Sequence, residues 1–263
     1  MHTYTRLALS LIVAASLPST LTAIVAPASP AAHKPTTAKP KPSAAKPAPS
    51  TPPVDHTPVK LSTPALPVGE ALHQDLLVAA STGDLTRFQR YVGKGASTTA
   101  AQQDGTTALM LAAKNGRLNI VDYLIGQKVD VNAANSYGFT ALTYAAMEGF
   151  ADVAQRLIDS QATVDAADKN GVTPFMWAVR SNHLPVAQRL LLSGAAIDLR
   201  DAYGNTALIN AAGLGDATLV KMLIDNKANV NIKNSNGTTA LMKANAGHHD
   251  DVAALLTAAG ETQ

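Results

Sequence analysis

The feature that most constrains this chain is a 33-residue repeat that runs through its C-terminal part. Glycine, threonine and leucine each recur at this interval in one shared register. The three sets are Gly105, Gly138, Gly171, Gly204 and Gly237; Thr107, Thr140, Thr173, Thr206 and Thr239; and Leu124, Leu157, Leu190, Leu223 and Leu256. Because the register holds over five periods, the chain is predicted to stack one structural unit repeatedly, each unit burying its apolar face against the next.

Each unit is predicted to contain two short helices. The glycine suits a tight turn with a positive φ, and the threonine two residues later can cap the first helix. Paired small residues such as Ala145-Ala146 allow that helix to lie close to its neighbour, and Gly116, Gly149 and Gly215 are placed to end it in a left-handed conformation. In the second helix, as in residues 186–192, apolar side chains recur at helical spacing, so one face is expected to be buried.

The period, order and residue types resemble those of the ankyrin repeat family over about residues 71–261. The resemblance implies an all-α solenoid of helix-turn-helix units, joined by finger loops with β-turns. About six repeats are expected, and they occupy residues 70–101, 102–134, 135–167, 168–200, 201–233 and 234–263. The first lacks the loop glycine and reads as a degenerate N-terminal cap.

The family motif Thr-Pro-Leu-His is altered in every repeat. It becomes Thr-Ala-Leu-Met at residues 107–110 and 239–242, and no repeat keeps the histidine that bonds neighbouring loops in the family. We therefore expect packing and Asp or Asn side chains to order the loops. The Thr-Ala-Leu-Met variant, with an export signal, is similar to exported bacterial ankyrin proteins, some of which are linked to protection against peroxide.

The first residues are predicted to be an export signal. Residues 7–17 form an apolar run that ends at Pro18. This run is too short to span a bilayer, and small residues follow it. We expect residues 1–26 to be a signal peptide, the protein to be periplasmic or secreted, and no integral membrane domain to remain after cleavage. An uncleaved anchor stays an alternative, because the weakly apolar stretch continues to Ala26.

Residues 27–69 are expected to form a disordered linker rich in proline, alanine and lysine. They contain twelve of the fifteen prolines, and such a composition cannot offset its ordering entropy by burial. We interpret the segment as a spacer, with binding to an anionic cell-wall polymer or lipid as the alternative.

Charge and composition argue against several function classes. Residues 1–70 hold six basic and two acidic residues, whereas residues 71–263 hold fifteen basic and seventeen acidic ones, so the repeat part lacks the basic excess of a nucleic-acid binder. The absence of cysteine excludes disulfides and thiolate chemistry. No nucleophile elbow or phosphate loop is found, so neither catalysis nor a cofactor is expected. The run at residues 248–251, His-His-Asp-Asp, is not expected to hold a metal, because adjacent helical residues diverge by about 100°.

The resemblance implies that a protein partner binds on the concave face, made of loop tips and the exposed side of the first helices. Aromatic and cationic side chains, which are typical of binding hot spots, gather at those positions in the middle repeats. The predicted contact residues are Tyr137, Phe139, Tyr144, Met147, Trp177, Arg180 and Tyr203. For Tyr144 and Trp177, packing between repeats is an equal alternative. Four other aromatic residues, Tyr91, Tyr123, Phe150 and Phe175, are assigned to the core.

We therefore predict a non-catalytic scaffold, monomeric by itself, that binds another protein in the cell envelope or outside the cell. The alternatives are a structural envelope protein in which the linker is the working element, and a secreted effector that binds host proteins. Exposed aromatic residues favour binding over a spacer role.

Overall fold

The computed structural model describes residues 68–260. The predicted signal peptide, residues 1–26, and nearly all of the predicted linker, residues 27–69, lie outside the described residues. The first helix begins at Val68, so the last two residues assigned to the linker belong to that helix.

The described residues form twelve α-helices in six pairs. In chain order they are α1 (Val68–Thr82), α2 (Leu85–Gly93), α3 (Ala108–Lys114), α4 (Leu118–Gly126), α5 (Ala141–Glu148), α6 (Ala151–Asp159), α7 (Pro174–Arg180), α8 (Leu184–Leu192), α9 (Ala207–Leu214), α10 (Ala217–Asp225), α11 (Ala240–Ala246) and α12 (Asp250–Ala258). This confirms the predicted all-α solenoid. No helix within residues 68–260 is long and apolar enough to cross a membrane.

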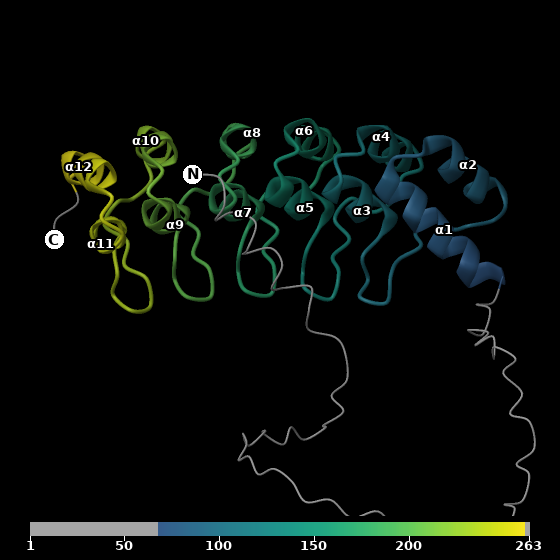
Figure 1. Ribbon diagram of the computed structural model, residues 1–263, viewed down its shortest axis with the longest axis horizontal. Helices are drawn as coiled ribbons and strands as arrows, with labels where there is room; N and C mark the ends of the chain where they lie inside the picture. Colours follow the sequence, from purple (N-terminus) through teal and green to yellow (C-terminus); the bar gives the residue numbers. More distant parts are fainter. Residues whose placement is uncertain (1–67, 261–263) are drawn as a thin grey trace, which may run out of the picture. The chain divides into compact units, whose positions relative to one another are not determined.

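The helices lie in two rows (Figure 1). Odd-numbered helices pack against one another in one row, and even-numbered helices form the second row, which lies above the first in Figure 1. A finger loop extends from each even-numbered helix to the next odd-numbered one, on the side away from the second row. We call the surface formed by the loops and the odd-numbered helices the inner face, and the surface of the even-numbered helices the outer face.

Threonine starts every first helix after the cap, as predicted. In each of the five repeats its side-chain oxygen accepts a hydrogen bond from the backbone N–H three residues later, at 3.2–3.3 Å. The loop glycine two residues before each threonine has a φ between 73° and 83°. The repeated threonine and glycine are therefore explained by the start of the helix and by the turn before it.

The core runs continuously between the two rows. Small residues such as Ala112, Ala113, Ala145 and Ala146 are fully buried in the odd-numbered helices, which lets neighbouring helices approach closely. The repeated leucines of the second helices are also fully buried; these are Leu124, Leu157, Leu190, Leu223 and Leu256. Phe175 is buried as predicted, and Tyr91 and Tyr123 pack half-buried against the core.

The N-terminal cap differs from the other repeats in its first helix. Helix α1 has 15 residues, whereas α3 has 7 and α5 has 8. Residues 68–74, which lie 33 positions before the loop residues 101–107 of the next repeat, are helical in the cap. Leu76, Leu77 and Ala80 on α1 are buried, so the cap closes one end of the core.

The glycine that ends the first helix lets a side chain of the next repeat pack over it. A Cβ built on Gly116 would lie 2.5 Å from the ring of Phe150, and one built on Gly149 would lie 2.6 Å from His183. His249 contacts Gly215 in the same way. The assignment of Phe150 to the core is therefore wrong: the residue is 36% exposed, and its ring covers Gly116 at the edge of the stack.

Candidate protein-binding surface

Four of the five finger loops are each held by one buried Asn or Asp at the base. In the third repeat, Oδ1 of Asn135 accepts the backbone N–H groups of Tyr137 and Phe139, both at 3.0 Å. Asp168, Asp201 and Asn234 accept the equivalent pairs in the following repeats, at 2.8–3.0 Å. These side chains take the loop-ordering role that the missing histidine has in the family, as the sequence predicted.

The loops are also bonded to one another through the backbone. The N–H of Ser136 donates to the carbonyl of Asp104 at 2.7 Å, and the N–H of Lys169 donates to the carbonyl of Tyr137 at 3.0 Å. Ala202 and Ser235 donate in the same way to Asn170 and Tyr203, at 2.8 and 2.9 Å. The loop tips therefore form a connected row along the inner face.

Four of the predicted contact residues form one aromatic cluster, which we define as Tyr137, Phe139, Tyr144 and Trp177. Phe139 lies at its centre. Its ring centroid lies 6.2 Å from that of Tyr137, and it meets Tyr144 and Trp177 edge to face at 5.4 and 5.7 Å. Edge-to-face pairs at these distances are favourable, so the cluster joins the third and fourth repeats.

Tyr144 and Trp177 turn out to pack between repeats. Tyr144 is 8% exposed, and its hydroxyl accepts a hydrogen bond from Nδ2 of Asn135 at 3.2 Å. Trp177 is half-buried, and its Nε1 donates to Oδ2 of Asp168 at 3.0 Å. Each ring is thus tied to the loop base nine residues earlier. Phe139, which was expected to be exposed, is half-buried between these two rings.

Tyr137 and Tyr203 lie exposed at loop tips, as predicted. They are 58% and 67% exposed, and their backbone N–H groups are fixed by Asn135 and Asp201. Met147 is half-buried on α5 and packs against the core. Arg180 is exposed at the end of α7, with its guanidinium 5.5 Å from the centroid of the Trp177 ring. A rigid phenol on a fixed loop loses little conformational freedom when it is buried by a partner.

The aromatic series on the first helices stops in the fifth repeat. The residue equivalent to Tyr144 and Trp177 is Asn210, and its Nδ2 is buried without a hydrogen-bond partner in the described residues. Asp201, at the loop base below, bonds Asn205 instead. The cluster therefore has a polar border on the side of Tyr203.

The comparisons with known proteins agree with this architecture. A family model described as ankyrin repeats in three copies matches residues 76–168, 128–201 and 175–262. The chain belongs to the ankyrin repeat family. It is also similar to a chain in the solved complex of the predatory endopeptidase Bd0816 from Bdellovibrio bacteriovorus with the immunity protein Bd3460, at 34% identity and a TM-score of 0.65. The match covers 70% of this chain and 97% of that chain. No curated protein matches the chain.

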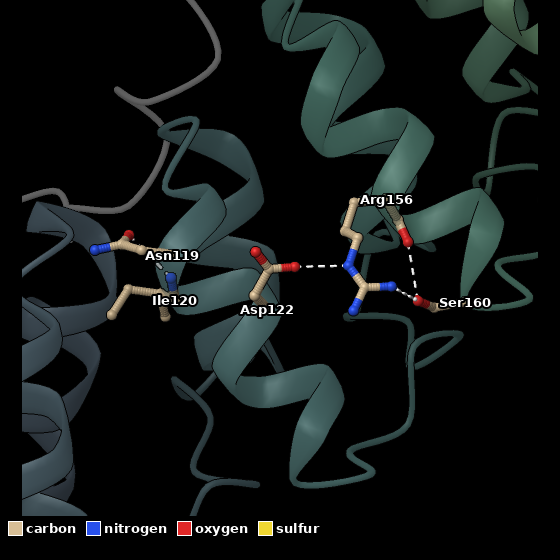
Figure 2. A network of polar contacts seen from close by, with 5 residues as sticks. All are labelled: Asn119, Ile120, Asp122, Arg156 and Ser160. Atoms are coloured by element: carbon tan, nitrogen blue, oxygen red, sulfur yellow. Dashed lines mark hydrogen bonds and ion pairs between the residues drawn. The ribbon is translucent and has the colours of Figure 1, made fainter.

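The outer face of the ankyrin stack carries a polar network between neighbouring repeats. Figure 2 shows Arg156 on α6, which donates from Nε to Asp122 on α4 at 2.6 Å and from a second nitrogen to Ser160 at 3.0 Å. Arg189 on α8 bonds Asp152 on α6 at 3.0 Å. These groups line a shallow groove of about 280 Å³, but because they are exposed and paired with one another, we assign them to alignment of the helices.

The two adjacent histidines near the C-terminus of the ankyrin stack, His248 and His249, lie in different environments. His248 is exposed with a φ of 56°, whereas the ring of His249 packs over Gly215 and Gly247. Within residues 68–260, no group of three or more His, Cys, Asp or Glu side chains is arranged to hold a metal ion. The contact of His249 with Gly215 explains that residue as part of the packing between repeats.

Proposed function

We propose that this chain is a non-catalytic binding protein that holds another protein on its inner face, in the cell envelope or outside the cell. The observation that carries the proposal is the aromatic cluster, in which Tyr137 and Phe139 lie on a fixed loop, together with the exposed rings of Tyr137 and Tyr203 at the loop tips. Tyr, Trp and Arg dominate binding hot spots, and all three occur here within adjacent repeats. The export signal predicted for residues 1–26 supports the location.

The structural comparison supports the same role. The similar chain comes from a complex of an endopeptidase with an immunity protein, so a chain of this fold takes part there in a protein–protein complex. Ankyrin stacks offer a long surface without a deep cavity, which suits a protein partner better than a small molecule.

The test compares two variants that both change exposed residues only. The inner-face variant is Tyr137→Ala with Tyr203→Ala, and the control is Leu192→Ala on the outer helix α8, where the side chain is 89% exposed. Proteins crosslinked to the wild-type chain in its native envelope fraction are identified by mass spectrometry. The affinity of the purified partner for each variant is then measured by calorimetry.

We expect the inner-face variant to lose at least about 2 kcal/mol of binding free energy, and the control to bind like the wild type. Equal binding by all three proteins would place the contact elsewhere and overturn the proposal. Circular dichroism confirms that each variant is folded before binding is measured.

A further inference from the structure

The two faces of the stack differ in their ion pairs. The four ion pairs described within residues 68–260 all involve the even-numbered helices or their caps. They are Arg87–Asp84, Arg156–Asp122, Arg189–Asp152 and Lys221–Asp225. In the odd-numbered helices from α3 to α11, the exposed cations Lys114, Arg180 and Lys243 take part in none of these pairs, and neither does the exposed Lys169 in the loop before α7. The row of helices from α3 to α11 therefore carries an excess of positive charge, although the repeat part as a whole is slightly acidic.

The carboxylates of Asp168 and Asp104, in the loops before α7 and α3, are already hydrogen-bonded inside the protein. Asp168 is buried and accepts hydrogen bonds from the N–H groups of Asn170, Val172 and the Trp177 ring. Asp104 accepts two hydrogen bonds from Thr106, both at 2.9 Å. Glu148, half-buried at the end of α5, is the one acid in helices α3, α5, α7, α9 and α11.

Two of the cations stand at opposite ends of the aromatic cluster. Lys114 Nζ lies 5.6 Å from the centroid of the Tyr144 ring, and the Arg180 guanidinium lies 5.5 Å from that of Trp177. Phe139 contacts both rings. The order across the surface is thus cation, ring, Phe139, ring, cation. Stacking on the rings orients the two charges before any partner arrives.

We infer that the partner meets this face with an acidic segment, in which carboxylate side chains flank an apolar side chain. The inference rests on the proposed function and names the chemistry of the partner. The apolar side chain would pack on Tyr137 and Phe139, and the carboxylates would pair with Lys114 and with Arg180 or Lys169. A lysine-rich occupant, such as residues 27–69 of this chain, would bring like charges together at the same place.

The experiment selects short random peptides, displayed on phage, for binding to the full-length protein. Asp and Glu are expected to be enriched over Lys and Arg relative to the unselected library, next to one aromatic or aliphatic residue. A synthetic copy of the most enriched peptide is then titrated against Lys114→Glu with Arg180→Glu. The matched control is Arg90→Glu with Lys94→Glu at the end of the outer helix α2, where both residues are exposed.

Charge reversal on the inner face is expected to weaken binding by at least about tenfold, while the outer control stays within about twofold of the wild type. Binding to the wild type should also weaken as salt is added. If the peptides lose affinity for Tyr137→Ala with Tyr203→Ala but show no acidic bias, this inference is wrong while the proposed function stands. If neither inner-face variant affects any selected peptide, both are wrong.

Discussion

The imidazole of His183 lies directly against Gly149 of the preceding repeat, with its Nε2 3.1 Å from the carbonyl oxygen of Met147. Gly149 ends helix α5 with a φ of 84°, a conformation that any side chain would strain. One position thus ends a helix and also receives the ring of the next repeat.

This contact predicts the effect of Gly149→Ala. The added methyl group would lie 2.6 Å from Nδ1 of His183 and would also be held at a positive φ. We expect the free energy of unfolding to fall by about 2–4 kcal/mol, from the left-handed strain and the displaced ring together. Urea unfolding followed by circular dichroism measures the change.

Gly126→Ala is the matched control, because Gly126 lies in helix α4 and a Cβ there meets nothing within 4 Å. This substitution should leave stability unchanged or raise it by up to about 1 kcal/mol. Equal losses in the two variants would mean that the ring contact has no energetic role.

A second prediction concerns the fourth repeat, which is one of two that lack this glycine. Asn182 occupies the equivalent position with a φ of 58°, and the residue that corresponds to His183 in the next repeat is the short Asp216 instead of a ring. We expect Asp216→His to destabilise the protein, because the ring would meet the side chain of Asn182 and because the Asp216 cap on Thr218 and Leu219 is lost.

The part of this loss that comes from the ring should be recovered when Asn182→Gly is added. A double-mutant cycle is therefore expected to give a favourable coupling of about 1–2 kcal/mol between the two substitutions. If the two substitutions have additive effects on the free energy of unfolding, residues 182 and 216 are not coupled and the prediction is wrong.

The third prediction concerns the match between each loop base and the ring above it. Asp168 uses one carboxylate oxygen for two backbone N–H groups and the other for Nε1 of Trp177. In Asp168→Asn, the amide nitrogen would face the indole N–H, and two donors would oppose each other. We expect the variant to lose about 1–3 kcal/mol of stability, measured by urea unfolding with Trp177 fluorescence as the signal.

Asn135→Asp makes the opposite exchange in the third repeat and serves as the comparison. There the facing groups are the hydroxyl of Thr106, whose proton goes to Asp104, and the hydroxyl of Tyr144, which can donate to a carboxylate. The Asn135→Asp variant should therefore lose less stability than Asp168→Asn. The reverse order would contradict this account of the loop bases.

The fourth prediction is a loss of stability at alkaline pH. Burial, with the nearby charge of Asp104, raises the pKa of Tyr144 above its ordinary value of 10.0. In the unfolded chain the phenol ionises near that value, whereas the folded protein keeps the proton to higher pH. The free energy of unfolding should therefore fall as the pH rises above about 10, until the folded pKa is passed.

Tyr144→Phe removes the ionising group and should flatten this part of the stability profile. Urea unfolding of both proteins between about pH 8.5 and pH 11 gives the comparison. Parallel profiles would show that Tyr144 titrates alike in the folded and unfolded states.

The sequence was sufficient to predict the parts of the fold that repeat. Thr107 and its counterparts cap helices, and Gly149 and Gly215 end helices with a left-handed conformation, because these roles depend on residues a few positions away. The start of the cap was predicted less accurately, because helix α1 begins at Val68, within the segment that was predicted to be linker.

The burial of each aromatic side chain was harder to predict, because it depends on contacts with residues of the neighbouring repeat. Phe150 was placed in the core, yet its ring lies over Gly116, 34 positions earlier. For Tyr144 and Trp177 the sequence left exposure and packing equally open, and their hydrogen bonds to Asn135 and Asp168 show that they pack between repeats. A signal was present in both cases: a ring 34 residues after a helix-ending glycine, and Asn with Tyr or Asp with Trp nine residues apart.

The row of backbone hydrogen bonds between loop tips has a consequence for association. Because the Tyr137 loop is bonded to its neighbours on both sides, its shape is fixed before a partner arrives. A partner would spend little of its interaction energy on ordering the receptor, so the surface is preorganised and can engage in a single step. A change in the conformation of one loop tip would alter the hydrogen bonds of the adjoining loops. Several loops together therefore form the recognition surface.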